Sequence, residues 1–334
     1  MSYFLYKLEF DSPVHFGNAE QGGKLEQVGM DYPSDTLFSA ICSELALQHE
    51  TETLNWFITS VKEEKIVFSN LFPFLKKADQ EDFLYLPKPV LSAPQDNSEK
   101  RLSLEELKAA ATNRKKQKKI NYIRCGKLND YFTSLRTGSR FEDNMEFGTV
   151  SLTQRVARRE DPPLPYYVAK YVFKDGAGMY LVASFSEEKA GSRFKDILDL
   201  LGLSGIGGKR SSGFGKFHIA YSAQLNENSH GDAGVLFHLL EDRTALWQMN
   251  VSSVLPFIED LEQVKEGQYK LQKRSGFVTA VNGEAEMKKN SLYLIAAGSC
   301  FKKRLAGRLV ALGNTGSHDV LRCGKGLYVG LALS

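Results

Sequence analysis

The sequence predicts an α+β protein of two domains, the first containing a β-α-β-β-α-β unit of the ferredoxin-like type. Strand-like and helix-like segments are mixed, with few helices and without regular alternation, which favours α+β over a parallel α/β fold. The 334 residues exceed the usual size of one domain. The polar segment at residues 226–232 has the composition of a linker. We therefore expect domains at residues 1–222 and 233–334, joined by residues 223–232.

The first elements follow a strand, loop and helix order. Residues 3–10 alternate in strand fashion and end at a turn-forming Asp-Ser-Pro. Ser34 is a suitable N-cap, Asp35 lies in the first helical turn, and apolar residues then recur at helical spacing. This pattern predicts a helix of about four turns. Short strands are expected at residues 65–68 and 83–86.

An insertion at about residues 87–146 interrupts the strand pattern. Within it, residues 103–121 have an N-cap serine, an acidic first turn and the basic run RKKQKK at residues 114–119. These charges suit the helix dipole. The basic run is therefore interpreted either as a solvated helix end or as a surface that contacts phosphate.

Clear strand and helix patterns return after the insertion. The first domain continues with strands at residues 147–152, 166–173 and 179–185, an amphipathic helix at 187–201, a glycine-rich loop at 205–215 and a strand at 214–221. The second domain has segments of strand character at residues 235–240, 269–281, 291–297, 307–312 and 327–331.

Composition excludes several classes of protein. With 42% hydrophobic and 25% charged residues the chain should fold, and no apolar run approaches a membrane span of about 20 residues. The N-terminus lacks the pattern of a signal peptide, so we expect a soluble, cytoplasmic protein. The four cysteines have no metal-binding or redox spacing. A net charge of +3 is too small to identify a nucleic-acid binder by itself.

The glycine-rich loop is the segment most suited to binding a polyanion. Glycines let backbone N–H groups approach a phosphate, while cations and hydroxyls add charged and polar donors. The loop does not complete the Walker pattern, and it follows a helix rather than a strand, so it is not a dinucleotide fingerprint either. No cofactor is expected. The loop residues are Gly205, Ile206, Gly207, Gly208, Lys209, Arg210, Ser211, Ser212, Gly213, Phe214 and Gly215.

These residues carry a resemblance to a known family. The loop resembles the G-rich loop of the RAMP proteins of CRISPR systems. Three further segments, at residues 12–17 (SPVHFG), 33–40 (PSDTLFSA) and 269–278 (YKLQKRSGFV), narrow the match. In this order, together with the C-terminal Arg-x-Gly at Arg322, they resemble the subunit of the type III-A (Csm) interference complex that caps the crRNA 5′ end.

The resemblance implies an architecture, a ligand and partners. The architecture is two ferredoxin-like (RRM-like) domains with a thumb-like insertion, and the ligand is the repeat-derived 5′ handle of crRNA. Members bind the large polymerase/cyclase-type subunit and a repeating backbone RAMP subunit, and they meet target RNA only indirectly. Besides the loop, the expected RNA-binding residues are His15, Gly17, Arg155, Lys273, Arg274 and Arg322. The Lys273-Arg274 pair has a second interpretation, a charged strand edge that opposes aggregation.

Two enzymatic interpretations stand beside this one. Some relatives of this fold cleave precursor guide RNA without metal, and His15 is the candidate general acid or base for that reaction. Backbone-type RAMP subunits use an aspartate to cut target RNA, but Asp35 in a first helical turn is better explained by the helix dipole. A third hypothesis is a protein-only adaptor that uses the loop as a docking turn. We expect a non-catalytic RNA-binding subunit without metal.

Overall fold

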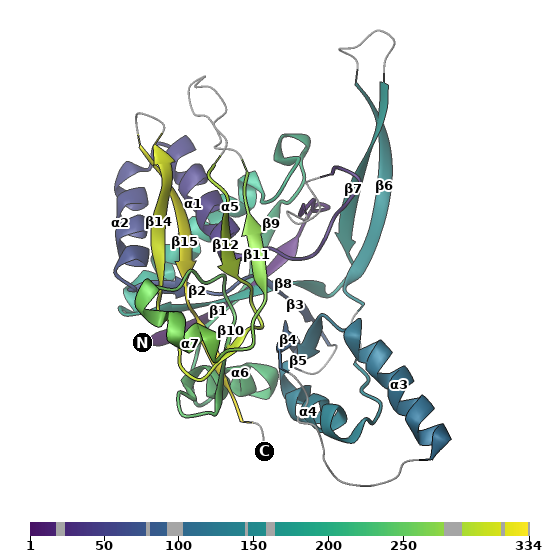
Figure 1. The fold of residues 1–334 in the computed structure, drawn as a ribbon. Helices are drawn as coiled ribbons and strands as arrows, with labels where there is room; N and C mark the ends of the chain where they lie inside the picture. Colours follow the sequence, from purple (N-terminus) through teal and green to yellow (C-terminus); the bar gives the residue numbers. More distant parts are fainter. Residues whose placement is uncertain are drawn as a thin grey trace.

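The computed structural model describes residues 1–17, 24–77, 81–91, 103–143, 146–157, 164–276, 289–314 and 318–332. Its centre is a seven-stranded antiparallel sheet with the path β5-β4-β3-β8-β1-β9, in which β2 also pairs with β8 (Figure 1). The strands of this sheet are β1 (Ser2–Phe10), β2 (Ile66–Phe68), β3 (Phe72–Leu75), β4 (Phe83–Pro87), β5 (Tyr122–Arg124), β8 (Ala177–Phe185) and β9 (Phe217–Leu225).

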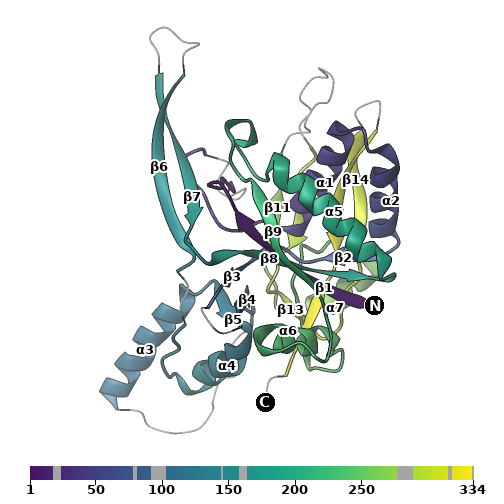
Figure 2. The ribbon, with the colours of Figure 1, turned by 180° about the vertical axis from the view of Figure 1, so that it is seen from behind.

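The sheet is buried on both faces. Alternate residues of β1 point to opposite sides, so that Tyr3 and Leu5 join one hydrophobic core while Tyr6 and Leu8 join the other. The second core is covered by α1 (Ser34–Leu47), α2 (Thr51–Lys62) and α5 (Lys189–Ser204) (Figure 2). The central strand β8 is buried throughout, which explains its continuous apolar sequence. The sequence correctly predicted β1, β2, β4, β8, α1 and α5 as elements.

Two details of this layer differ from expectation. Helix α1 begins at Ser34 itself, with Pro33 in the capping position and no side-chain cap. The Ser34 hydroxyl instead accepts a hydrogen bond from the Ser253 N–H at 2.9 Å, and the Ser34 N–H donates to Asn70 Oδ1. The prediction of Ser34 as N-cap is therefore wrong, because a tertiary contact uses its hydroxyl. Helix α2 was not predicted, although Leu54, Phe57 and Val61 have helical spacing.

Residues of the expected insertion form a separate lobe with α3 (Leu104–Lys118), β5, the 3₁₀ turn η2 (Cys125–Lys127) and α4 (Leu128–Thr137) (Figure 1). The basic run falls in the last turns of α3, as predicted. Strand β5 pairs with β4, which joins the lobe to the edge of the main sheet. The lobe is also fixed by Asp232, whose Oδ2 accepts hydrogen bonds from the Leu84 N–H and from Arg124 Nε.

A long two-stranded ribbon projects from the body next to this lobe. It consists of β6 (Gly148–Ala157) and β7 (Leu164–Phe173), paired along their whole length (Figure 1). The outer edge of β7 is bridged by the N-terminal segment, where Val14 and Tyr171 exchange two backbone hydrogen bonds of 2.9 Å. The base of the ribbon is thereby held against the segment that follows β1.

The C-terminal part is built from small sheets and short helices. The sheets are β13-β10-β16, β11-β12 and β14-β15. The elements are α6 (Gly231–Glu241), β10 (Trp247–Asn250), η4 (Ile258–Asp260), α7 (Leu261–Lys265), β11 (Leu271–Arg274), β12 (Leu292–Ile295), β13 (Cys300–Phe301), β14 (Gly307–Asn314), β15 (Asp319–Lys325) and β16 (Tyr328–Leu331). The predicted strands at 291–297, 307–312 and 327–331 are confirmed, and the one at 269–281 is confirmed for residues 271–274.

One predicted strand is a helix. Residues 235–240 lie in α6, with Leu236 and Leu240 on its buried side. A short apolar run does not distinguish a buried strand from a buried helix, and the spacing of the two leucines was the missed signal. Helix α6 also begins inside the expected linker, and its leucines share a core with Tyr3 and Leu5. In the described part of the chain, no helix is both long enough and apolar enough to cross a membrane.

Candidate nucleic-acid interface

The glycine-rich loop connects α5 to β9, as the sequence predicted. Its backbone needs glycine because Gly205, Gly207, Gly213 and Gly215 have φ values between 77° and 87°, a region that side chains disfavour. Lys209 also has a positive φ of 63°. Within the loop the residues Arg210–Ser212 form a short 3₁₀ turn, η3. This conformation turns Ile206 into the core, where it is fully buried.

The loop is held against the segment that follows β1. The Gly208 N–H donates to the His15 carbonyl at 2.8 Å, and the Gly215 N–H donates to the Pro13 carbonyl at 2.9 Å. A Cβ atom on Gly208 would lie 2.8 Å from the His15 ring, and one on Gly207 would lie 2.7 Å from the Phe16 ring. Some of the glycines that the sequence assigned to phosphate contact therefore serve close packing against residues 13–16.

Hydrogen bonds within the protein determine which backbone N–H groups of the loop remain able to bind a ligand. The N–H groups of residues 205, 206, 208 and 212–215 donate to carbonyl groups of the chain. The Gly207 N–H is bonded to buried Tyr32, whose pKa is raised by desolvation. Within the described residues, the N–H groups of Lys209, Arg210 and Ser211 have no acceptor among the backbone hydrogen bonds. The candidate donors are thus concentrated at the tip of the loop.

His15 is a buried anchor of this site. Its side chain is 6% exposed, and Nδ1 lies 2.7 Å from the Ala169 carbonyl oxygen. Because a carbonyl can only accept a hydrogen bond, Nδ1 carries the hydrogen and the ring is fixed between the loop and β7. Gly17, by contrast, is exposed, and an added Cβ there would meet nothing within 4 Å.

The ribbon contributes a second wall to the site. Arg155 on β6 donates from Nη1 to the Ser212 hydroxyl at 3.2 Å and lies over the Phe214 ring, 5.7 Å from its centroid. Lys209 lies at the same distance over the ring of Tyr166 on β7. The structure therefore brings Arg155 to the loop. Tyr166 was not among the expected residues, and its place opposite Arg155 in the ribbon could not be known before the strand register.

The two central cations of the loop differ in their surroundings. Arg210 Nη1 lies 3.8 Å from Glu44, a carboxylate that is only 3% exposed. Glu44 also accepts a hydrogen bond of 2.7 Å from the Ser204 hydroxyl. Lys209 takes part in no ion pair with another described residue. Lys209 is thus the freer charge, and part of the charge of Arg210 is neutralised by α1.

Arg274 and Arg322 are not exposed on the surface. Arg274 Nη2 lies 3.1 Å from Asp35 Oδ1, and Arg322 Nη1 lies 2.7 Å from Asp35 Oδ2. Asp35 is fully buried, and the two arginines are 6% and 5% exposed. Asp35 therefore has a structural role, as expected, but through two ion pairs rather than the helix dipole. Lys273, the neighbour of Arg274, is exposed on β11.

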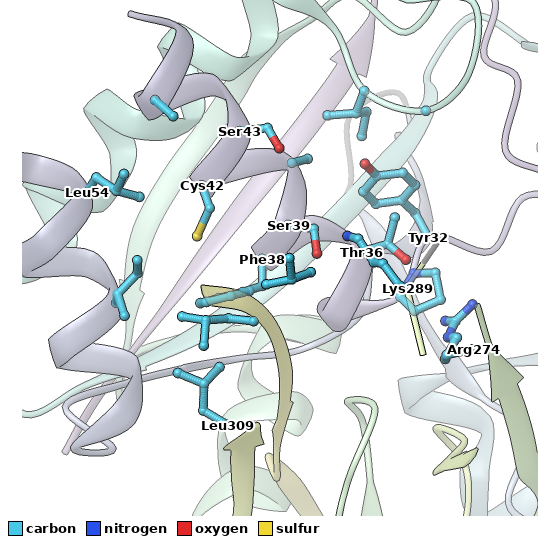
Figure 3. Close-up of a pocket in the computed structure, with 18 of the residues that line it drawn as sticks. Tyr32, Thr36, Phe38, Ser39, Cys42, Ser43, Leu54, Arg274, Lys289 and Leu309 are labelled. Atoms are coloured by element: carbon cyan, nitrogen blue, oxygen red, sulfur yellow. The ribbon is translucent and has the colours of Figure 1, made fainter. Parts of the chain in front are cut away.

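A large cavity lies between the loop, α1 and the β14-β15 hairpin. Its volume is about 1030 Å³. Figure 3 shows Tyr32, Thr36, Arg274 and Lys289 at one end, with Cys42 and Leu54 toward the other. The expected site residues that line it are His15, Gly17, Ile206, Gly207, Gly208, Arg210 and Arg274. Among the residues that the structure describes, no three His, Cys, Asp or Glu side chains are grouped to hold a metal ion.

Comparison with known proteins finds similar sequences over nearly the whole chain. A family model described as the CRISPR Csm4 C-terminal domain matches residues 243–331. The chain is 28% identical over 337 residues to the CRISPR system Cms protein Csm4 of Streptococcus thermophilus, and the alignment covers 98% of both sequences. The chain is therefore similar to Csm4 proteins over nearly its whole length. The Csm4 protein of Mycobacterium tuberculosis is 27% identical, with 99% of this chain and 98% of that protein covered.

Solved structures of the Csm4 family share the fold. A Csm3-Csm4 subcomplex of the type III-A CRISPR-Cas interference complex has a matching chain with a TM-score of 0.62 and 16% identity, over 99% of both chains. A Csm1-Csm4 cassette in complex with cA4 gives a TM-score of 0.58, also at 16% identity, over 100% of this chain and 99% of the other. The mixed α/β architecture with antiparallel sheets is therefore that of the Csm4 family.

Proposed function

We propose that this protein is a non-catalytic RNA-binding subunit of a type III-A CRISPR effector complex and holds the repeat-derived 5′ handle of crRNA. The observation that carries the proposal is the tip of the glycine-rich loop. There Lys209, backbone N–H groups with no backbone acceptor among the described residues, and the exposed residues Ser211 and Ser212 lie beside Arg155 and the Tyr166 and Phe214 rings. Cations and amides bind phosphates, and aromatic rings stack on unpaired bases.

The proposed partners are the large polymerase/cyclase-type subunit and the repeating backbone subunit. Relatives with this fold are found in a Csm1-Csm4 cassette and in a Csm3-Csm4 subcomplex. A subunit that contacts both kinds of partner bridges the head of the complex to its backbone and meets target RNA only through the assembly.

The proposed fold assignment is two ferredoxin-like domains. For the first, the strand order β3-β8-β1-β9 with helices between β1 and β3 and between β8 and β9 is that of a β-α-β-β-α-β unit. The second domain would cover residues 233–334, and the lobe of α3 and α4 would be the thumb-like insertion. The common core of Tyr3, Leu5 and Leu236 supports two domains that are packed together rather than loosely linked.

The surroundings of two buried side chains, His15 and Asp35, support the proposal that the protein is not a catalyst. The His15 ring is held between Gly208 and the Ala169 carbonyl group, so it is poorly placed to exchange a proton with an RNA hydroxyl. The Asp35 carboxylate is enclosed between two arginines. Both side chains therefore support the protein scaffold in this proposal.

The loop cations give the direct test. Replacement of Lys209 and Arg210 by alanine should weaken binding of a single-stranded RNA carrying the handle sequence. The log–log dependence of affinity on salt should become shallower by roughly 0.7 for each lost phosphate contact. The matched control is the adjacent pair Lys302 and Lys303, which is exposed and distant from the loop in sequence. An unchanged affinity and slope in the loop variant would refute the proposal.

Crosslinking distinguishes the RNA clamp from a protein-only adaptor. Ultraviolet crosslinking of the assembled complex, followed by mass spectrometry, should give RNA adducts at Tyr166, Phe214 or the residues between Lys209 and Ser212. An adaptor that uses the loop only to dock a protein would give no RNA adduct there while the complex still assembles.

A further inference from the structure

The cavity of about 1030 Å³ next to the loop has the size of a small-molecule site and walls of two kinds. One end is cationic, with Arg274 and Lys289 beside the first turn of α1 (Figure 3). The other end is apolar, with Leu54, Ile58 and Leu309. A ligand that fills it should therefore carry an anionic group at one end and an apolar group at the other.

Arg274 lines the cationic end of the cavity and is itself buried. Arg274 is 94% buried, because its relative exposure is 6%. Its Nη2 bonds to Asp35, but its Nε is buried and has no hydrogen-bond partner among the described residues. The Nε of Arg322, a residue that does not line the cavity, is also buried and has no hydrogen-bond partner among the described residues. Both Nε atoms are enclosed by the protein, so a ligand in the cavity would meet only the part of Arg274 that lines the cavity wall.

The charges at this end do not balance. Asp35 is a single carboxylate, and it faces Arg274, Arg322 and Lys289. Burial lowers the pKa of Lys289, and the charge of Arg322 lowers it further, while Asp35 opposes the shift. Around the whole cavity the lining contains Lys62, Arg210, Arg274 and Lys289 against the carboxylates Asp31 and Asp319, and Glu44 behind the lining neutralises part of the charge of Arg210. An anion is the species that would relieve this excess of positive charge.

The apolar end suits a flat ring. Its side chains come from α1, α2 and the β14-β15 hairpin, and they include Phe38, Ile58 and Leu321. Ser39 and Ser43 lie between the two ends on α1, and Thr36 lies at the cationic end (Figure 3). This order of cations, hydroxyls and apolar side chains matches the phosphate, sugar and base of one nucleotide.

We propose that the cavity binds one nucleotide, with its phosphate at Arg274 and Lys289 and its base against the apolar end. The cavity is continuous with the candidate RNA interface, because Gly207, Gly208 and Arg210 also line it. The statement that this nucleotide belongs to a bound RNA strand rests on the proposed function. The statement that the cavity binds a nucleotide rests only on the residues of the cavity.

The experiment measures calorimetric binding of adenosine 5′-monophosphate and of adenosine to the full chain. The wild type should bind the monophosphate at least tenfold more tightly than adenosine. Lys289→Gln should reduce this ratio below about threefold, and Lys289→Arg should restore it. Lys265→Gln is the control, since Lys265 is exposed and paired with Glu262. Thermal unfolding of each variant identifies any loss of folding.

The outcomes separate this inference from the proposed function. Equal binding of the monophosphate and adenosine, or a ratio unaffected by Lys289→Gln, overturns the nucleotide cavity. Lys209→Ala is expected to leave monophosphate binding unchanged even where it weakens RNA binding. If Lys289→Gln also weakens single-stranded RNA binding, the nucleotide belongs to the strand. If it affects the monophosphate alone, the cavity binds a free nucleotide.

Discussion

Asp35 and Arg322 are 287 positions apart in the chain, and their Oδ2 and Nη1 atoms lie 2.7 Å apart in a fully buried ion pair. Arg274, 239 positions from Asp35, bonds to the other carboxylate oxygen. The first turn of α1 is thereby joined to β11 and β15. This contact connects the two ends of the sequence through one side chain.

Loss of the Asp35 charge should destabilise the fold strongly. Asp35→Asn leaves two buried guanidinium groups without a counterion, and such a change typically costs about 3 to 5 kcal/mol. Asp130→Asn is the matched control, because Asp130 is also in a first helical turn but is exposed. A carboxylate that acts only on the helix dipole contributes about 0.3 to 1 kcal/mol. Urea unfolding of both variants measures the difference, and equal losses would contradict the role of the ion pairs.

Two glycines of the loop should respond differently to alanine. Gly213 and Gly215 have similar φ values of 81° and 77°. A Cβ on Gly215 would lie 1.9 Å from the Ile206 carbonyl oxygen, whereas one on Gly213 meets nothing within 4 Å. Gly213→Ala should cost about 1 to 2 kcal/mol for the backbone strain alone. Gly215→Ala should cost at least about 2 kcal/mol more, because backbone atoms must move. Similar unfolding free energies would show that packing against Ile206 is unimportant.

The buried His15 ring predicts that the protein does not process precursor RNA. Incubation of the purified chain with a repeat-containing precursor RNA in EDTA should give no cleavage, because Nδ1–H is bonded to the Ala169 carbonyl and the ring is 6% exposed. Gel analysis over several hours is a sufficient measurement. Cleavage that His15→Ala abolishes would establish the metal-independent endoribonuclease instead.

The thiol of Cys323 should make stability depend on alkaline pH. Burial raises its pKa from 9.0 to about 12. The folded state therefore holds this proton more tightly than the unfolded chain, so the thiol's contribution is complete below pH 9 and falls as the pH rises toward 12. The expected slope is at most about 1.4 kcal/mol per pH unit. The unfolding free energy of Cys323→Ala should depend less on pH than that of the wild type between pH 9 and 11. Parallel curves would contradict this.

The sequence predicted the parts of the fold that local patterns specify. The alternation in β1, the helical spacing of α1 and α5, and the glycines between α5 and β9 are all signals within about 20 residues. Helix α6 was mistaken for a strand, because its four-residue leucine spacing lies within a short apolar run.

The candidate site was only partly predictable. Lys209 and Arg155 were expected to act in one interface, and the structure brings both to the loop. The burial of Arg274 and Arg322 could not be foreseen, since their partner Asp35 is more than 230 positions away. Lys289 was missed for the same reason. The sequence near Lys289 shows only a lysine like the others in the chain. Its place at the cavity depends on how distant segments pack.

The position of β1 between β8 and β9 has a consequence for synthesis of the chain. Residues 2–10 leave the ribosome first, but the paired residues of β8 end at Phe185 and those of β9 end at Leu225. At about 5 to 20 residues per second, the first strand waits roughly 10 to 40 s for its first neighbour. During that time an apolar strand has two open edges, which is the condition that favours aggregation. Early growth of the chain is therefore the stage at which a chaperone would be most useful to this protein.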